Sequence, residues 1–152
     1  APWAKNDDGR SILRGATVLD VFAGSGAYGL EALSRGADYV TFFENSTEAI
    51  AAIDQNILKL DIKEKTKMMR GNVLTVPATR YPLPDITFLD PPYGKDLIVQ
   101  SIEVLKKKGW LSPETLLVIE TESKKPDSLP DHFEILSERA YGKSKVIIGR
   151  LA

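Results

Sequence analysis

Cysteine is absent from this sequence of 152 residues, and histidine occurs once, as His132. These absences exclude zinc sites built from cysteine and histidine, and they exclude catalysis by a cysteine nucleophile. Long apolar runs are also missing: no segment approaches the roughly 18 residues that a membrane helix needs, and no secretory signal opens the chain. We therefore expect a protein of the reducing cytoplasm that does not span a membrane and needs no metal ion.

Neither sign of charge dominates the sequence. Lys and Arg number 20 against 21 for Asp and Glu, which leaves a formal net charge of −1. This balance differs from the strongly basic composition of a free-standing nucleic-acid binder, although it allows a local basic patch. The length and the 43% of hydrophobic residues fit one globular domain.

Short apolar segments alternate with segments of helical periodicity along the chain. Strands are expected at residues 17–22, 39–44, 67–70, 85–90 and 115–121. A first helix is expected at residues 27–35 and a third at residues 97–107. Between them, a second helix is expected to run from a cap at Ser46 or Thr47 to Leu60, with an apolar stripe formed by Ile50, Ile53, Ile57 and Leu60. The tail, residues 133–139 and 145–150, is expected to form an antiparallel hairpin.

This alternation predicts an α/β fold with a doubly wound, mostly parallel sheet, because parallel neighbouring strands need crossover connections. Such sheets bind ligands outside the carboxyl ends of their strands. The unusual residues of the chain fall at those ends: Gly24-Ser-Gly26, Glu44, Asn72 and Asp90-Pro-Pro-Tyr93. We expect the ligand site where these segments meet.

The segment Gly24-Ser-Gly-Ala-Tyr-Gly29 matches the pattern G-x-G-x-x-G between an expected strand and an expected helix. Glycine allows a sharp turn there and lets a ligand approach the backbone closely. Glu44, about 20 residues on, suits hydrogen bonds to both ribose hydroxyls of a cofactor. The alternative interpretation is a turn that merely closes a βα unit.

Two cofactors compete for this loop. A dinucleotide would place its pyrophosphate on the helix N-terminus, whereas S-adenosylmethionine would lay its methionine portion across the loop. Asp20 favours S-adenosylmethionine, because a carboxylate at this position would repel a pyrophosphate but could reach the cationic amino group of the methionine portion.

Asp90-Pro-Pro-Tyr93 follows the fourth expected strand, where its simplest interpretation is a proline-stiffened turn. Its chemical interpretation starts from an exocyclic base nitrogen, a poor nucleophile because its lone pair is delocalised into the ring. The Asp90 side chain and the Pro91 carbonyl would accept hydrogen bonds from its N–H groups, and Tyr93 would stack on the base. Together with the glycine loop, this predicts a base-amine methyltransferase that works largely by proximity and orientation.

On these motifs the chain resembles the bacterial 16S ribosomal RNA guanine-N2 methyltransferase family. The likeness rests first on residues 19–37, which end in Glu-Ala-Leu-Ser-Arg-Gly-Ala. It rests also on the tetrapeptide at residues 90–93, which has Asp where related amine methylases more often have Asn, and on residues 108–111 and 118–122. The resemblance implies a seven-stranded Rossmann-like methyltransferase sheet, S-adenosylmethionine as cofactor, and guanine N2 of 16S ribosomal RNA as target. The RNA partner would be naked or part of the small ribosomal subunit.

The residue patterns and the resemblance together define the expected site. The catalytic residues are expected to be Asp90, Pro91, Pro92 and Tyr93. The cofactor contacts are expected from Asp20, Phe22, Ala23, Gly24, Ser25, Gly26, Glu44, Asn45, Asn72 and Val73, with Asn72 near the adenine. Substrate phosphates could be contacted by Lys95, Lys143 and Lys145, whereas residues 106–108 are expected to be a solvated helix end.

One departure and several alternatives stay open. The family usually carries an upstream Arg-Pro-Thr segment that helps to cover the site and contact RNA, and residues 1–15 lack this signature. Either the natural N-terminus is missing or this chain engages its substrate differently, so residues 1–16 are treated as an extension and 17–152 as the methyltransferase domain. The alternatives are a DNA or protein-amide N-methyltransferase, an NAD-dependent oxidoreductase, and a binding module without turnover.

Overall fold

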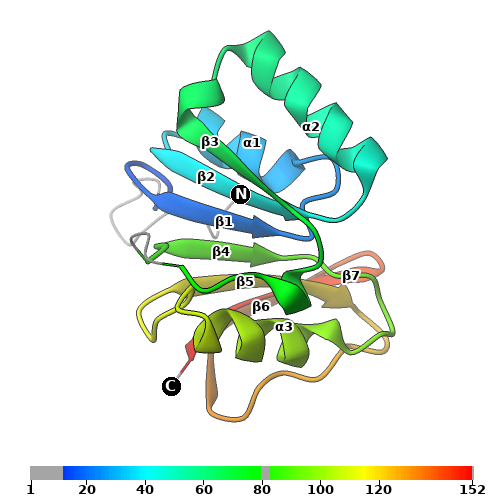
Figure 1. The fold of residues 1–152 in the computed structure, drawn as a ribbon. Helices are drawn as coiled ribbons and strands as arrows, with labels where there is room; N and C mark the ends of the chain where they lie inside the picture. The colour runs from blue at the N-terminus through cyan, green and yellow to red at the C-terminus, as the bar shows by residue number, and fades with distance from the viewer. Residues whose placement is uncertain (1–11, 80–82, 152) are drawn as a thin grey trace.

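The computed structural model describes residues 12–79 and 83–151, which form a seven-stranded sheet with helices on both faces (Figure 1). The strand order is β3-β2-β1-β4-β5-β7-β6, with β1 to β5 parallel and β7 antiparallel to both of its neighbours. The strands are β1 (Thr17–Val21), β2 (Tyr39–Glu44), β3 (Thr66–Arg70), β4 (Ile86–Leu89), β5 (Leu116–Glu122), β6 (Phe133–Tyr141) and β7 (Ser144–Leu151).

Three of the connections between the parallel strands contain an α-helix. The helices α1 (Ala27–Ser34) and α2 (Thr47–Leu60) pack on one face of the sheet, and α3 (Leu97–Lys107) packs on the other. Short 3-10 turns, η2 (Lys63–Lys65) and η3 (Val73–Thr75), flank β3. The helix α2 begins where the Ser46 side chain accepts a hydrogen bond from the Ala49 amide at 3.3 Å, as expected for an N-cap.

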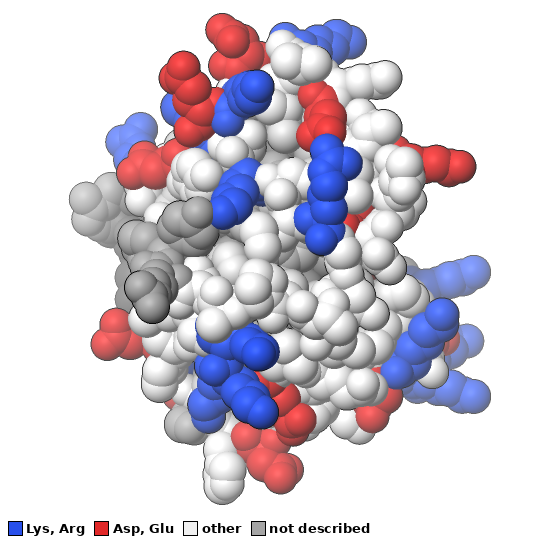
Figure 2. Space-filling view, viewed as in Figure 1, with Lys and Arg blue, Asp and Glu red and all other residues white. Residues whose placement is uncertain are grey.

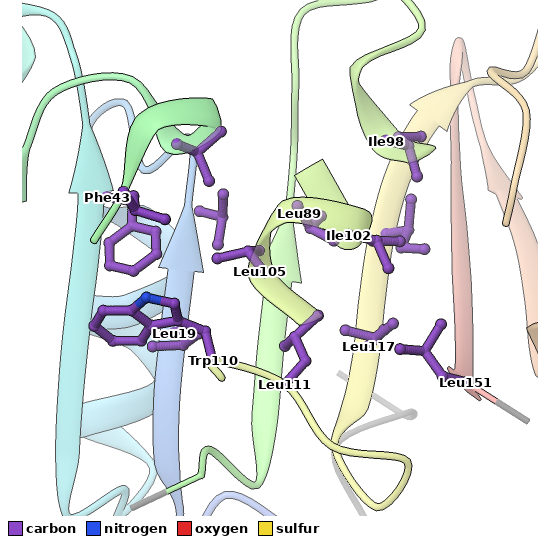
Figure 3. Packing of buried hydrophobic residues seen from close by; sticks show 14 of the residues in the cluster. Leu19, Phe43, Leu89, Ile98, Ile102, Leu105, Trp110, Leu111, Leu117 and Leu151 are labelled. Carbon is purple, nitrogen blue, oxygen red and sulfur yellow. The ribbon is translucent and has the colours of Figure 1, made fainter. Parts of the chain in front are cut away.

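The two faces of the sheet carry separate hydrophobic clusters, because successive side chains of a strand point to opposite faces. In β1, Val18 packs toward α1 and α2, whereas Leu19 and Val21 pack toward α3. Figure 3 shows the α3 cluster, in which Leu105 and Trp110 lie over the central strands. Burial on both faces holds the central strands rigidly and so fixes the positions of their carboxyl ends.

The predicted fold class, a doubly wound and mostly parallel seven-stranded sheet with a C-terminal hairpin, is confirmed. The predicted stripe on α2 is wrong at Leu60, which is 57% exposed because it closes the helix beyond the contact with the sheet. The expectation for residues 1–16 lies mostly outside the described residues. Within the described ranges, no helix is long and apolar enough to cross a membrane.

Candidate active site

Two adjacent cavities, which we call lobes, lie at the carboxyl ends of the parallel strands, on the side to which the arrows of β1, β2 and β4 point in Figure 1. The first, which we call the β2/β3 lobe, has a volume of about 450 Å³ and is lined mainly by segments that follow β2 and β3. The second, the β4/β5 lobe, has a volume of about 580 Å³ and is lined by the glycine loop, residues 90–93 and Glu120. Both lobes share Phe22, Glu44 and Pro92.

The glycine loop bends sharply between β1 and α1, and two of its glycines adopt a left-handed conformation. Gly24 has a φ of 55° and open space around the position of a Cβ, so the backbone is exposed toward the β4/β5 lobe. Gly26 has a φ of 79° and lines neither lobe. At Gly29 a Cβ would lie 2.4 Å from Phe42 Cε1, so this glycine allows α1 to approach β2.

Phe22 also adopts a left-handed conformation, with a φ of 60°. For a residue with a Cβ this conformation costs on the order of 1–3 kcal/mol, and such strain is concentrated at functional sites. The ring packs against the α3 cluster and forms part of the wall of both lobes. The strained turn therefore places an aromatic side chain where the two lobes join.

Glu44 at the end of β2 ties three backbone amides together. One carboxylate oxygen accepts a hydrogen bond from Gly24 N at 2.7 Å, and the other accepts from Asn45 N at 3.0 Å and from Ser46 N at 2.8 Å. A carboxylate offers about four acceptor positions, so at least one stays available to a ligand. Glu44 therefore fixes the glycine loop to β2 and still presents an acceptor at the junction of the lobes.

Asp20, like Gly26, is a predicted cofactor residue that lies outside the two lobes. Its side chain is 1% exposed and accepts a hydrogen bond from Gly29 N at 2.9 Å, and it lines neither lobe. Burial, with smaller contributions from the nearby Asp90 and Glu44 carboxylates, raises the pKa of Asp20 to about 8. The structure thus gives Asp20 a place beneath the loop, anchoring the N-terminal half of α1.

Asp90 lies in the β4/β5 lobe next to a carboxylate that the sequence motifs do not single out. The carboxyl groups of Asp90 and Glu120 lie close enough to hydrogen-bond to each other, which they can do only while one of them carries a proton. Burial, followed by the hydrogen bond and the negative charge of Glu120, raises the pKa of Asp90 to about 7. Tyr28 also lines this lobe, and its hydroxyl donates to Glu120 Oε1 at 3.2 Å.

Glu120 could have been found from the sequence by the rule that located the other residues. It is an acidic residue near the carboxyl end of the strand beside β4, where ligand-binding side chains of such sheets gather. Tyr28 gives no comparable signal, because a tyrosine in the first turn of a helix is ordinary. Its importance depends on the contact with Glu120.

The proline pair and Tyr93 form the outer wall of the β4/β5 lobe. Pro91 is buried, whereas Pro92 and Tyr93 are exposed toward the opening. The Tyr93 hydroxyl is hydrogen-bonded to Ser144 Oγ at 2.7 Å, which ties the loop after β4 to the first residue of β7. A flat ring held at the mouth of the lobe is suited to stack on a base.

The β2/β3 lobe contains the remaining predicted cofactor residues. Asn45 and Asn72 lie on its wall, and Val73 is buried at its base. The Asn72 side chain accepts a hydrogen bond from Leu74 N at 2.9 Å and so caps the 3-10 turn η3. The structure therefore brings together twelve of the predicted site residues around the two lobes: Phe22, Ala23, Gly24, Ser25, Glu44, Asn45, Asn72, Val73, Asp90, Pro91, Pro92 and Tyr93.

The lysines that were candidates for phosphate contact have different environments. Lys95 lines the β2/β3 lobe, and Lys143 is exposed at the β6–β7 turn. Lys145 instead forms an ion pair with Glu138. In the described part of the chain, no three His, Asp or Glu side chains gather in a way that could hold a metal ion.

Comparison with known proteins gives consistent matches. A family model described as conserved hypothetical protein 95 matches residues 3–150. The chain is 36% identical over 127 residues to ribosomal RNA small subunit methyltransferase D of Haemophilus influenzae, which covers 82% of this chain and 66% of that protein. It is 31% identical over 133 residues to the protein of the same name from Escherichia coli K12, and this alignment covers 87% of this chain and 67% of that protein. The chain thus spans just under two thirds of the length of the Haemophilus relative.

A solved structure agrees with these matches. A Haemophilus influenzae protein, described as a candidate methylase, superposes with a TM-score of 0.80 at 31% sequence identity. The superposition covers 92% of this chain and 89% of that chain. The similarity therefore extends over nearly the whole of both folds.

Proposed function

Because the chain belongs to the conserved hypothetical protein 95 family, we propose that it methylates the exocyclic amine of a guanine in 16S ribosomal RNA, with S-adenosylmethionine as methyl donor. The observation that carries this proposal is the β4/β5 lobe. In it the glycine loop, from Ala23 to Ser25, faces the segment from Asp90 to Tyr93 across one cavity. A cofactor held on the loop would lie directly opposite the groups that receive the base.

The residues present fit this cofactor. Gly24 leaves open space where a side chain would otherwise exclude the methionine portion, and Glu44 keeps acceptor capacity for ribose hydroxyls. The β2/β3 lobe, with Asn72 and Val73, would receive the adenine. When bound, S-adenosylmethionine supplies an electrophilic methyl group.

The residues of the β4/β5 lobe would orient the base amine toward that methyl group. Once the proton of the Asp90–Glu120 pair is released, the Asp90 carboxylate and the Pro91 carbonyl would each accept a hydrogen bond from the amine, which favours the pyramidal geometry needed for attack. Tyr93, held by Ser144, would stack on the base and fix its plane. Asp90 would take up the proton that the amine loses, so the chain acts mainly by positioning.

The choice of ribosomal RNA as substrate is supported by the names of the relatives that resemble this chain along most of its length. With a ribosomal substrate, the reaction would take place in the cytoplasm. Residues 17–152 would form the catalytic domain.

The proposal is tested by a methyl-transfer assay with radiolabelled S-adenosylmethionine. The substrates are naked 16S RNA and small ribosomal subunits from bacterial cells that lack the activity, and the products are analysed as nucleosides. We expect N2-methylguanosine with the native chain and a loss of at least about 100-fold with Asp90→Ala, since the acceptor of the amine is removed. The matched control is Asp38→Ala, an exposed aspartate at the other end of the sheet.

Cofactor binding, measured by calorimetry, separates the possible failures. No transfer by the native chain to either RNA despite tight binding of S-adenosylmethionine would overturn the RNA substrate and favour DNA or a protein amide. Binding of NAD in preference to S-adenosylmethionine would overturn the methyltransferase assignment itself.

A further inference from the structure

A second carboxylate lies beside Asp90 at the substrate end of the β4/β5 lobe. The strands β4 and β5 run parallel with Leu89 level with Ile119, so the next residues, Asp90 and Glu120, lie side by side. Both line the lobe, and their carboxyl groups lie close enough to hydrogen-bond while one of them is protonated. A carboxylate so close to the group that receives the amine should contact the same base.

The Glu120 side chain is held in place from the opposite side by Tyr28. The Tyr28 hydroxyl donates to Glu120 Oε1 at 3.2 Å, and the ring stacks on Phe88 with 4.8 Å between the ring centroids. Burial and the charge of Glu120 raise the pKa of Tyr28 far above its usual value, so the hydroxyl stays a donor. Tyr28 thereby occupies one acceptor position on Glu120, and the contact with Asp90 uses a second while one carboxyl group of the pair is protonated. A carboxylate offers about four such positions, so acceptor capacity stays available to a base in the lobe.

We propose that Glu120 is a specificity-determining residue that accepts a hydrogen bond from the ring N1–H of guanine while Asp90 and the Pro91 carbonyl accept from the adjacent amine. This inference rests on the proposed function and names the base which that function would select.

The chemistry of the bases gives the reason for this selectivity. Adenine and cytosine each place an unprotonated ring nitrogen, an acceptor, next to the exocyclic amine. Guanine is the one standard base whose amine adjoins a ring N–H. Two neighbouring carboxylates can accept from both donors of guanine, but one of them would face an acceptor in either of the other bases. A site built to receive such a donor rejects analogues that lack it, because its buried polar group is left unpaired.

The test compares guanine with 2-aminopurine, which keeps the amine but has an acceptor at N1. Two RNA substrates are prepared that differ only in carrying guanine or 2-aminopurine at the methylated nucleotide. We expect kcat/KM of the native chain to favour guanine by about 10- to 100-fold, the usual value of a hydrogen bond to a charged group. In Glu120→Gln the preference should fall to within about threefold, because an amide can accept from one base or donate to the other.

The matched control is Glu122→Gln, which changes the same residue type two positions along β5, outside both lobes. This variant should keep the native preference for guanine. Affinity for S-adenosylmethionine, measured by calorimetry, should be the same in all three proteins if Glu120 acts on the base alone.

Each outcome decides the inference. Transfer to guanine and 2-aminopurine with equal efficiency by the native chain would overturn the role of Glu120 and leave the proposed function intact. A preference for guanine that persists in Glu120→Gln would also overturn that role. Failure of the native chain to methylate either RNA would overturn the proposed function together with this inference.

Discussion

Glu44 has two tasks in one side chain, and a single substitution should reveal both. Glu44→Ala removes the acceptor of the Gly24, Asn45 and Ser46 amides and the expected acceptor of the ribose hydroxyls. Hydrogen bonds to a charged group contribute about 1.5–3 kcal/mol, so the dissociation constant of S-adenosylmethionine should rise by about 10- to 100-fold. Isothermal titration calorimetry measures this change.

The control for this substitution is Glu48→Ala, in the first turn of α2. It removes a carboxylate from the same neighbourhood without any contact to the lobes. An equal loss of affinity in both variants would mean that any negative charge near the start of α2 has this effect, and that the hydrogen bonds of Glu44 are not its cause.

Asp20 predicts a pH dependence of stability. Because burial raises its pKa from 3.8 to about 8, the folded chain retains a proton that the unfolded chain releases. The protonated Asp20 carboxyl group therefore makes its full contribution to the stability of the folded state below its pKa in the unfolded chain. That contribution is lost as the pH rises from about 4 to about 8. Asp20→Asn stays neutral at every pH and keeps an oxygen for the Gly29 amide. Relative to the native chain, its melting temperature should rise by several degrees more at pH 9 than at pH 5.

Thermal unfolding without cofactor measures this difference, with Asp38→Asn as an exposed control that should shift equally at both pH values. Calorimetry on Asp20→Asn tests the original expectation for the residue as well. A large loss of affinity for S-adenosylmethionine would mean that Asp20 contacts the cofactor after all. A difference in melting temperature between Asp20→Asn and the native chain that is the same at pH 5 and pH 9 would show that the pKa of Asp20 is not raised by burial.

Asp20 and Glu120 show how far single residues could be predicted from the sequence. The motif placed Asp20 close to the glycine loop, and the structure does put it there, but its depth of burial depends on α1 closing over it. Glu120 becomes visible only when β5 is known to lie next to β4, which is a fact of sheet order. Pairing across sequence-distant strands is the information that local patterns lack.

At the scale of elements, local signals were sufficient where a cap or a glycine marks the boundary. The helix α2 starts after the Ser46 cap and ends before Asp61, as its apolar spacing indicated. The strand β3 is a weaker case, because it lies at the edge of the sheet with half-exposed side chains and has little hydrophobic pattern. The burial of a helix's last residues depends on tertiary contacts, so the exposure of Leu60 at the end of α2 was not predictable from periodicity.

The packing of α1 on β2 predicts an unusual response to a substitution that normally stabilises a helix. Alanine in place of a helical glycine usually contributes about 0.5–1 kcal/mol. At Gly29, however, the new Cβ would lie 2.4 Å from Phe42 Cε1 and 2.8 Å from Val40 Cγ1. Gly29→Ala should therefore lower the free energy of unfolding by about 1–3 kcal/mol, measured by urea denaturation.

A double variant checks the physical cause. Phe42→Leu removes the ring atoms that the added methyl would strike, so the cost of Gly29→Ala should be smaller in the Phe42→Leu background than in the native chain. Equal costs in both backgrounds would show that the loss arises elsewhere in α1.

At the scale of the whole molecule, the sheet brings one end of five parallel strands together and with them every element of the proposed site. The net charge of −1 gives no general attraction to RNA, so any attraction must be local. Figure 2 shows Lys and Arg side chains at the lower right of the molecule, where Figure 1 places the loops after β4 and β5 and the β6–β7 turn. The exposed lysines of these segments are Lys95, Lys124, Lys125 and Lys143.

Lys143 precedes Ser144, which is hydrogen-bonded to Tyr93 of the β4/β5 lobe, and the amide of Ser123 donates to the Lys143 carbonyl. Lys124 and Lys143 therefore follow or precede residues tied to the wall of that lobe, and we expect the RNA backbone to pass over them. The double variant Lys124→Gln/Lys143→Gln should weaken binding of 16S RNA several-fold. Because each phosphate contact contributes about 0.7–0.9 to the slope of log affinity against log salt, the slope should become shallower by about 1 to 2. Affinity for S-adenosylmethionine should stay the same, since neither lysine lines a lobe.

Lys106→Gln/Lys107→Gln is the matched control, because it removes two exposed lysines from the end of α3 that lies toward the amino ends of the parallel strands, away from the lobes. Both variants change the net charge by the same amount, so a general electrostatic effect would alter their salt slopes equally. A larger loss for the α3 pair would mean that the RNA backbone crosses that helix end. A loss of RNA affinity confined to the Lys124→Gln/Lys143→Gln variant would support a single mode of binding. In that mode these lysines hold phosphates outside the β4/β5 lobe, and Asp90 and Glu120 hold the base within it.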